Sequence, residues 1–413
     1  MKFEEYPIAP EIKRSLETLG FKRPTDIQYK SILPILKGED VLAIAQTGTG
    51  KTAAFAIPII NMLHLRKNAS RPDGVKCLVM APTHELAVQI AEVFRRIAMH
   101  TRVKIYCIHG GVAQDPQIEK LNKGVDVLVA TPGRMFDLES QRYLRLHRVE
   151  ILVLDEADHM LDLGFIKDIK ELVAKLPRKR QTLFFSATIN EYIKKTAYTL
   201  VNSNAIRIQI SPKDPVSKNV HHTVAFIEMD DKRFFLERFI KENPESKILV
   251  FVRTKVRAER VHSAMQRVGI TTATMHSSKE QDERTATMKA FRKGDVKILI
   301  ATDVSARGID IPDVDFVINY DLPDVAENYV HRIGRTGRGM QKGFAVSFCS
   351  SEEKNMLAEI EAFLNKPIER LEIKKNDYLD TLDFTEDVDN NWKALLNEAE
   401  NNKDKFKKKK KKK

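Results

Sequence analysis

The chain has 413 residues, a length that favours two domains and a tail over one domain. Its net charge of +12 favours a polyanionic partner, with nucleic acid ahead of a membrane surface. The N-terminus, MKFEEYPIAP, lacks the layout of a secretion signal, and no apolar run approaches the roughly 18 residues of a membrane span. Cys77, Cys107 and Cys349 are far apart and lack metal-ligand spacing, which indicates reduced thiols. We expect a cytoplasmic protein with no membrane contact.

Short apolar runs of strand character alternate with longer segments of helical periodicity. This alternation predicts an α/β fold of parallel βαβ units, in which helices cover both faces of each sheet. The series pauses at 211–219 (SPKDPVSKN), a polar segment with two prolines, which we interpret as a linker between two domains of similar size. The expected strands include Val41–Ala45, Cys77–Ala81, Val127–Ala130, Ile151–Leu154 and Leu183–Phe185 in the first domain, and Ile248–Val252, Lys297–Ala301, Phe316–Asn319 and Phe344–Phe348 in the second.

The first strand-like run leads into a glycine-rich loop and then into an apolar helix start. Strand, loop and helix in this order are the context of a phosphate loop, although Ala45 stands where the general pattern has glycine. Glycines let backbone N–H groups approach phosphates, and the helix N-terminus favours negative charge. We expect Lys51 to neutralise the β- and γ-phosphates of ATP and the Thr52 hydroxyl to ligate Mg²⁺. The nucleotide-binding loop is Ala45-Gln46-Thr47-Gly48-Thr49-Gly50-Lys51-Thr52.

About a hundred residues later, the apolar run Ile151–Leu154 leads into Asp155-Glu156-Ala157-Asp158. Ligands of parallel sheets bind at the carboxyl ends of the strands, which is where a buried strand would deliver these carboxylates. Alone, the four letters would equally fit an acidic patch on an exposed helix. Combined with the strand and the upstream loop, they predict that Asp155 holds Mg²⁺ and that Glu156 orients and deprotonates the water attacking the γ-phosphorus.

These motifs together resemble the DEAD-box RNA helicases of superfamily 2, over roughly residues 3–345. The resemblance implies tandem RecA-like domains, each a mostly parallel sheet flanked by helices. Their expected bounds are 1–29 for a Q-motif region, 30–210 for the ATP-binding domain, 211–219 for the linker, 220–368 for the helicase domain and 369–413 for a tail. Within Gly20–Gln28, which is similar to the Q motif, Phe21 would stack on adenine and Gln28 would pair with its edge. Phe3 stands where the family has an isolated aromatic residue.

The resemblance also assigns residues that would connect the two domains. Ser186-Ala187-Thr188 is similar to the family's coupling motif, whose hydroxyls bond the DEAD carboxylates, here including Asp158. His331–Gly339 is similar to motif VI, in which Arg335 and Arg338 match arginine fingers and His331 joins the γ-phosphate network. Fingers stabilise the charge that builds on a transferring phosphoryl group. The same arginines and glycines would also fit a generic phosphate or RNA patch.

Further segments at strand ends or turns match the family's RNA contacts, which position a strand without reading its bases. Ala301–Asp310 resembles motif V, in which Asp310 would contact the ribose while Arg307 and Thr302 face the ATP and RNA sides. The segment Pro82–Ala87 has His84 where the family has arginine, so a fixed charge is missing there. The RNA contacts implied by the resemblance are Pro82, Thr83, Gly110, Gly111, Thr131, Gly133, Arg134, Arg253, Thr254, Arg284 and Thr302.

After about Lys366 the alternation fades and charge dominates the sequence. Asp377–Glu400 carries eight acidic residues against one lysine, and Lys403–Lys413 carries nine lysines against Asp404. Blocks of like charge rarely fold alone, so we expect a disordered tail. The lysines fit either a solubilising extension or an electrostatic tether that raises the local RNA concentration.

The resemblance implies an RNA-dependent ATPase in which the second domain supplies fingers to ATP bound by the first. Such an enzyme separates short RNA duplexes or remodels RNA–protein complexes. The alternatives are an ATP-dependent RNA clamp with little unwinding and a DNA helicase or translocase, whereas a simple P-loop ATPase leaves the fingers unexplained. We expect a monomeric core, with protein or ribosomal partners reached through the tail.

Overall fold

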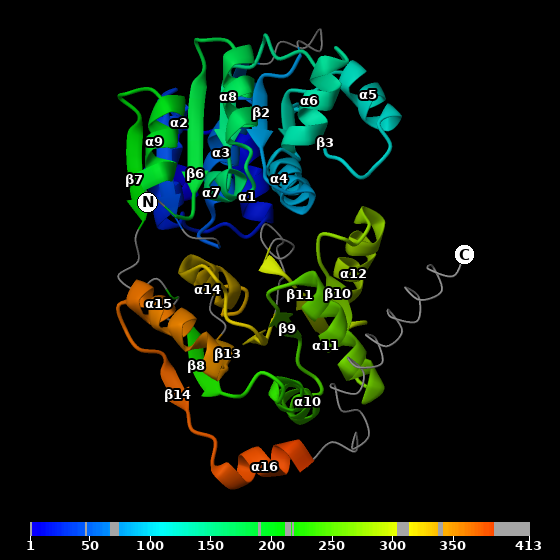
Figure 1. Cartoon of the computed structure of the whole chain (residues 1–413). Helices are drawn as coiled ribbons and strands as arrows, with labels where there is room; N and C mark the ends of the chain where they lie inside the picture. Colours follow the sequence, from blue (N-terminus) through cyan, green and yellow to red (C-terminus); the bar gives the residue numbers. More distant parts are fainter. Residues whose placement is uncertain are drawn as a thin grey trace, which may run out of the picture.

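The computed structural model describes residues 2–45, 48–66, 74–188, 191–210, 216, 219–303, 314–337 and 342–383. Within them the chain forms two α/β domains, one above the other in Figure 1, each built on a seven-stranded sheet. The strand pairings in both sheets are parallel. The α/β fold with two parallel sheets that the sequence predicts is therefore confirmed.

The first sheet has the order β3-β4-β2-β5-β6-β1-β7, so the chain crosses over repeatedly through its helices. Strands β5 and β1 flank β6, while β4 lies between β3 and β2. The elements of this domain are η1 (Phe3–Glu5), α1 (Pro10–Thr18), α2 (Asp26–Leu36), β1 (Val41–Ala45), α3 (Lys51–Arg66), β2 (Cys77–Met80), α4 (His84–Ile97), β3 (Ile105–Ile108), α5 (Asp115–Asn122), β4 (Val127–Ala130), α6 (Pro132–Ser140), β5 (Ile151–Leu154), α7 (Ala157–Asp162), α8 (Ile166–Lys175), β6 (Gln181–Ser186), α9 (Glu191–Leu200) and β7 (Ile206–Ile210).

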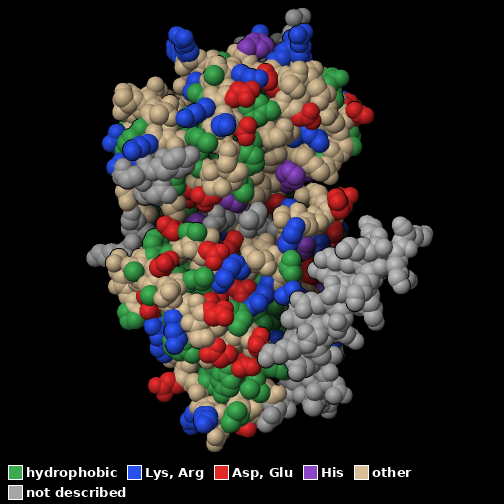
Figure 2. Space-filling view, in the orientation of Figure 1, with side chains coloured by type: hydrophobic (Ala, Val, Ile, Leu, Met, Phe, Trp, Pro, Cys, Tyr) green, Lys and Arg blue, Asp and Glu red, His purple; other side chains and the backbone are tan. Residues whose placement is uncertain are grey.

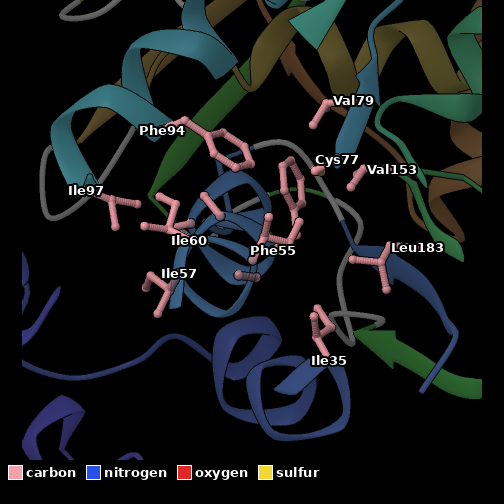
Figure 3. Packing of buried hydrophobic residues seen from close by; sticks show 14 of the residues in the cluster. Ile35, Phe55, Ile57, Ile60, Cys77, Val79, Phe94, Ile97, Val153 and Leu183 are labelled. Carbon is pink, nitrogen blue, oxygen red and sulfur yellow. The ribbon is translucent and has the colours of Figure 1, made fainter. Parts of the chain in front are cut away.

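Two apolar clusters, one on each face of this sheet, hold its helices in place. Helix α3 is buried along almost its whole length, which suits its near-continuous apolar sequence AAFAIPII. Its Phe55 ring lies 5.9 Å from that of Phe94 and 5.1 Å from that of Phe185, and Figure 3 shows it among Phe94, Cys77 and Leu183. Burying a side chain of this size contributes roughly 1.5–3 kcal/mol. The packing fixes the start of α3, and therefore the glycine-rich loop, against the sheet.

The second sheet has the order β10-β11-β9-β12-β13-β8-β14 and again separates two apolar clusters. Figure 1 shows α12 and α14 as the helices of this domain nearest to the first domain. The elements are β8 (Val220–Phe226), α10 (Lys232–Glu242), β9 (Ile248–Phe251), α11 (Lys255–Arg267), β10 (Ala273–Met275), α12 (Gln281–Lys293), β11 (Ile298–Ala301), β12 (Phe316–Asn319), α14 (Ala326–Ile333), β13 (Gly343–Cys349), η2 (Ser351–Glu353), α15 (Lys354–Leu364), β14 (Glu369–Leu371) and α16 (Lys375–Asp383).

The second domain extends further along the chain than the boundary at residue 368 expected from the sequence. Strand β14 pairs with β8, and α16 packs on α10 through the Phe235 and Tyr378 rings, 4.8 Å apart. Residues 369–383 thus belong to the folded domain. Strand β14 extends the sheet edge through its pairing with β8, and α16 covers α10 through an aromatic contact. Most of the expected linker and all residues from 384 onward lie outside the described residues.

In the described parts of the chain, no helix is both long and apolar enough to cross a membrane.

Candidate functional site

The candidate residues lie at the carboxyl edges of the two sheets, in an order set by topology. In the first sheet the neighbouring strands β5, β6 and β1 lead into Asp155, Ser186 and the glycine-rich loop. The other neighbours, β3, β4 and β2, lead into the predicted RNA contacts of this domain. One half of this edge therefore carries the residues predicted to bind nucleotide, and the other half carries those predicted to bind RNA. Ligands of parallel sheets bind beyond the carboxyl ends of the strands.

The glycine-rich loop is held by residues that precede β1. Gly48 and Gly50 have φ of 80° and 91°, a backbone region that favours glycine. The Gln28 amide nitrogen donates to the Gly50 carbonyl at 3.2 Å, and the Thr25 hydroxyl donates to the Thr49 carbonyl at 2.8 Å. A Cβ atom on Gly50 would lie 2.5 Å from the Gln28 Nε2 atom. Only glycine therefore permits this close approach.

Lys51 is the first residue of α3 and is buried. Its Nζ atom donates to the Ala45 carbonyl at the end of β1, at 2.8 Å. Thr52 follows on the same helix and is half-buried. The lysine is thereby pre-positioned across the mouth of the loop, where a phosphate would compete with the carbonyl for its ammonium group. Five further predicted site residues, Gln46, Thr47, Arg307, Asp310 and Arg338, lie outside the described residues.

Gln28 and Phe21 occupy the region expected to bind adenine. The Gln28 carbonyl oxygen accepts from the Thr25 backbone N–H at 2.9 Å, which caps α2. Phe21 is half-buried, and its ring meets that of Phe3 edge-on with centroids 5.9 Å apart. Both rings line an open pocket of about 680 Å³ together with Lys13 and other residues of this region. The adenine contacts of Phe21 and Gln28 remain predictions.

Asp155 and Glu156 directly follow β5 and are both largely buried. Glu156 has φ 48° and ψ 49°, a left-handed conformation that costs a non-glycine residue of order 1–3 kcal/mol. Its backbone N–H donates to the Asp155 carboxylate at 3.0 Å, which helps to hold this turn. Its carboxylate lies 3.7 Å from Nδ1 of His159, one helical turn later. Strain of this kind persists where the surroundings fix a side chain for a task.

The two carboxylates differ in their affinity for protons. Burial raises the pKa of Asp155 to about 7, because it outweighs the opposite effect of Lys51, and the negative charges of Glu156 and Asp158 raise the pKa further. Burial also acts to raise the pKa of Glu156, but His159, Lys51 and Arg335 together outweigh it and lower the pKa to about 2. Asp155 is thus a buried carboxylate short of positive charge, an environment that fits an added cation.

A magnesium ion fits this chemistry without a dedicated protein cage. Among the described residues no group of three or more His, Cys, Asp or Glu side chains is arranged around a metal position. Mg²⁺ usually retains waters and is held by one or two protein oxygens together with substrate phosphates. The Asp155 carboxylate and the Thr52 hydroxyl are the two oxygen ligands that the sequence predicts for such a site.

Asp158 connects β5 to the segment that follows β6. One of its carboxylate oxygens accepts from the backbone N–H groups of Ala187 and Thr188, at 3.1 and 2.9 Å, and from the Thr188 hydroxyl at 2.9 Å. The expectation that both hydroxyls of this motif bond the acidic residues is wrong for Ser186. The buried Ser186 hydroxyl donates instead to the Thr188 carbonyl at 2.7 Å, because that acceptor lies beside it.

Side chains of both domains line one pocket of about 90 Å³ beside these carboxylates. The first domain contributes Glu156, Asp158 and Thr188, and the second contributes His331 and Arg335 from the end of α14. Arg335 is buried, and its Nε atom donates to the His331 carbonyl at 3.3 Å. Only residues of both domains together complete this pocket.

An ion pair that the sequence reasoning missed fixes the helix carrying His331 and Arg335. Arg332 is 1% exposed, and its guanidinium binds both carboxylate oxygens of Asp303 at 2.6 and 2.7 Å. It also donates to the Asp321 carbonyl at 2.6 Å. The Arg332 guanidinium thus joins α14 to the segments that follow β11 and β12. No local pattern reveals it, since Asp303 and Arg332 meet only in the folded domain.

The predicted RNA contacts lie at strand ends and helix starts. Thr83 and Thr254 cap α4 and α11, each accepting a backbone N–H three residues later, at 3.3 and 3.1 Å. Arg134 donates to the Val112 carbonyl at 2.9 Å, while Arg253 donates to Glu353 at 2.9 Å and pairs with Asp324. On the face in Figure 2, basic and acidic side chains are interspersed.

The other predicted RNA contacts also fall at the carboxyl edges. Pro82 follows β2, Gly110 and Gly111 follow β3, Thr131 and Gly133 lie at the start of α6, and Thr302 follows β11. Arg284 of α12 instead pairs with Glu85 of the first domain at 2.7 Å. Among these residues, Gly111 and Arg284 lie against the other domain, and the contact of the whole set with RNA remains a prediction.

Comparisons with known proteins match both domains. Residues 25–196 match the family model of the DEAD/DEAH box helicase, and residues 231–340 match that of the helicase conserved C-terminal domain. The ATP-dependent RNA helicase RhlB of Shewanella frigidimarina is 39% identical over 388 residues, which cover 92% of this chain and 88% of that protein.

Solved structures resemble the whole chain. The DEAD-box helicase Mss116 bound to single-stranded RNA and UDP-BeF matches with a TM-score of 0.82 and 30% identity, over 93% of this chain and 82% of that chain. Dbp5 of S. cerevisiae bound to RNA and ADP BeF₃ matches with a TM-score of 0.80 and 30% identity, over 92% and 98%. A Dbp5 variant bound to Nup159, Gle1 and ADP scores 0.62 at 28% identity, over 91% and 98%. The overall arrangement is therefore closer to the RNA-bound form of Dbp5.

Proposed function

Because the chain belongs to the DEAD/DEAH box helicase family, and is an ATP-hydrolysing RNA helicase with two tandem RecA-like domains, we propose that RNA stimulates its ATP hydrolysis through domain closure. Closure in turn separates short RNA duplexes or remodels RNA–protein complexes. The observation that carries the proposal is the shared pocket, in which Glu156 of the first domain lies with His331 and Arg335 of the second. The site is complete only while the domains are together.

Lys51 and three residues of the pocket have separate tasks in hydrolysis. Lys51 binds the β- and γ-phosphates, and Glu156, with its carboxylate ionised near neutral pH, orients the attacking water and accepts its proton. Arg335 stabilises charge that develops on the transferring phosphoryl group, an effect worth about 10³–10⁵ in rate for arginine fingers. His331, beside it, joins the contacts to the γ-phosphate. The sequence places Arg338 as the second finger.

Thr52 and Asp155 would hold the Mg²⁺ ion that accompanies ATP. The ion supplies positive charge against the phosphate oxygens and against the buried carboxylate of Asp155. Phe21 and Gln28 would hold the adenine, and Asp310 the ribose. Asp158 and Thr188 link this site to the end of β6 through three hydrogen bonds, which couples nucleotide contacts to the rest of the sheet edge.

RNA would bind across the other half of both sheet edges. Glycines, threonine hydroxyls and guanidinium groups at Thr83, Gly110, Thr131, Arg134 and Arg253 are suited to phosphate and sugar contacts, which position a strand without reading bases. ATP and RNA would each favour the closed arrangement, so that each raises the affinity of the other. A strand bent to fit the closed form excludes an intact duplex, and hydrolysis with phosphate release reopens the protein. We also propose that the protein acts in the cytoplasm.

Purified protein tests the proposal directly. We expect ATP hydrolysis to rise on addition of single-stranded RNA, and a short RNA duplex to separate when ATP is present. No increase in hydrolysis with RNA would contradict the proposal. Stimulated hydrolysis without strand separation, for blunt and overhung duplexes alike, would instead identify an ATP-dependent clamp.

A further inference from the structure

His84, which stands where the family has arginine, lies at a second contact between the domains. It is the first residue of α4, and its Nδ1 atom lies 3.1 Å from Oε1 of Gln281, the first residue of α12 in the second domain. A carboxamide oxygen accepts only, so Nδ1 carries the proton and donates it. The imidazole thus engages the second domain as a hydrogen-bond donor.

Three neighbours complete this contact, which we name the α4–α12 contact (His84, Glu85, Gln281 and Arg284). The Gln281 amide nitrogen donates to Glu85 at 3.3 Å, and Arg284 pairs with the same carboxylate oxygen at 2.7 Å. Both charged side chains are only 12–15% exposed. The backbone of the first domain also approaches α12 closely at Gly111. A Cβ atom added to Gly111 would lie 2.9 Å from the Cβ atom of Gln281. There is little room for a rearranged side chain.

A second proton on His84 would enter an unfavourable environment in the closed protein. From β3 the ring of His109 stacks against that of His84 with centroids 5.3 Å apart, and from α12 the Arg284 guanidinium is nearby. The nearby carboxylate of Glu85 pairs with Arg284 through its Oε1 atom, and its Oε2 atom is buried with no hydrogen-bond partner. Burial, helped by His109 and Arg284, lowers the pKa of His84 below its ordinary value, and outweighs the opposite effects of Gln281 and Glu85.

We propose that His84 makes domain closure dependent on pH, with the neutral imidazole closing the α4–α12 contact and the protonated form opening it. The inference deepens the proposed function and rests on it. In an open form His84 would face water and bind protons with an ordinary pKa, near 6.5. Protons therefore bind the open form more tightly, so closure is full above this pH and is lost as the pH falls through it. An arginine at this position would remain charged throughout and could not respond.

The test measures the coupling between RNA and nucleotide in the full-length protein. The affinity for a fluorescent single-stranded RNA is determined with and without a non-hydrolysable ATP analogue, from about pH 5.5 to about pH 8. The ratio of the two affinities reports closure, because a contact made to RNA by one domain alone changes both affinities equally. His84→Gln keeps a neutral donor without titrating, and His84→Arg restores the family residue. His147→Gln, at an exposed histidine of the same domain, is the matched control.

Groups present in all four proteins, Asp155 among them, contribute a shared pH dependence. We expect the ratio for the unmodified chain and for His147→Gln to fall several-fold more towards low pH than the ratios for His84→Gln and His84→Arg, which keep only this shared dependence. A constant ratio in the unmodified chain, or an equal fall in His84→Gln, would overturn the inference. The inference would also be overturned if the RNA affinity of the unmodified chain, but not of His84→Gln, rose at low pH both with and without nucleotide. His84 would then bind an RNA phosphate. RNA-stimulated ATP hydrolysis at pH 8 tests the proposed function separately. If RNA does not stimulate hydrolysis at this pH, both the proposed function and the inference about His84 are wrong.

Discussion

The carboxylate of Glu156 is held in a strained left-handed turn beside His159, in a pocket shared with Arg335. Glu156→Gln keeps the shape of the side chain but removes its ability to accept a proton. We expect kcat for ATP to fall about 10²–10⁴-fold, the usual contribution of a general base. ATP and RNA affinities should change little, as measured by equilibrium titration beside a phosphate-release assay. Glu171→Gln on the exposed face of α8 is the control, and unaltered phosphate release in Glu156→Gln would exclude this residue as the base.

We expect Lys51 to act before hydrolysis, in the binding of ATP. Its ammonium group donates to the Ala45 backbone carbonyl at the mouth of the loop. Replacing Lys51 by alanine keeps the length of the loop but removes this positive charge. We expect Lys51→Ala to weaken ATP affinity by roughly 10- to 100-fold, the equivalent of a charged hydrogen bond of about 1.5–3 kcal/mol. Titration with a fluorescent ATP analogue measures this, and exposed Lys37→Ala is the matched control. Equal affinities in the two variants would contradict a phosphate-binding role.

Among the elements, α16 gives a prediction about stability. The Tyr378 hydroxyl donates to Asp231 at 2.7 Å, and Arg238 donates to the Thr381 hydroxyl at 2.6 Å, so the helix is tied to α10 by polar contacts as well as by its aromatic ring. A chain ending at Lys374 should lose roughly 1–3 kcal/mol of unfolding free energy in its second domain. A chain ending at Asp383 should lose none. Urea unfolding compares the two truncations, and equal midpoints would show that α16 does not stabilise the domain.

The same element shows where sequence patterns stop being informative. Strands buried on both faces, such as β1 and β5, form continuous apolar runs and could be predicted to the residue. Strand β7 alternates polar with apolar residues, β10 has three residues, and β14 is exposed, so their assignment depends on a neighbouring strand rather than on their own sequence. The charged composition around α16 hid a helix that packs on α10.

Site residues follow a similar rule. The sequence singles out Lys51, Asp155 and Glu156 because phosphate chemistry fixes both residue type and spacing after a strand, and their roles stay predictions. The Asp303–Arg332 ion pair and the contact between His84 and Gln281 join residues 29 and 197 positions apart, and no local pattern encodes them. The departure of His84 from arginine was visible in the sequence. Its consequence required the position of α12.

At the scale of the whole molecule, the lysine-rich end would add RNA affinity without adding recognition. The nine lysines in Lys403–Lys413 would release counterions from an RNA backbone, a contribution that salt suppresses. Replacing these lysines by glutamine keeps the length of the chain, so any change arises from charge. We expect lower RNA affinity and a shallower slope of log K against log salt, with unchanged ATP affinity and an unchanged coupling ratio between RNA and nucleotide. Replacing the same number of exposed lysines in the folded domains by glutamine is the comparison, and an unchanged salt slope in the tail variant would leave the lysines as a solubilising extension.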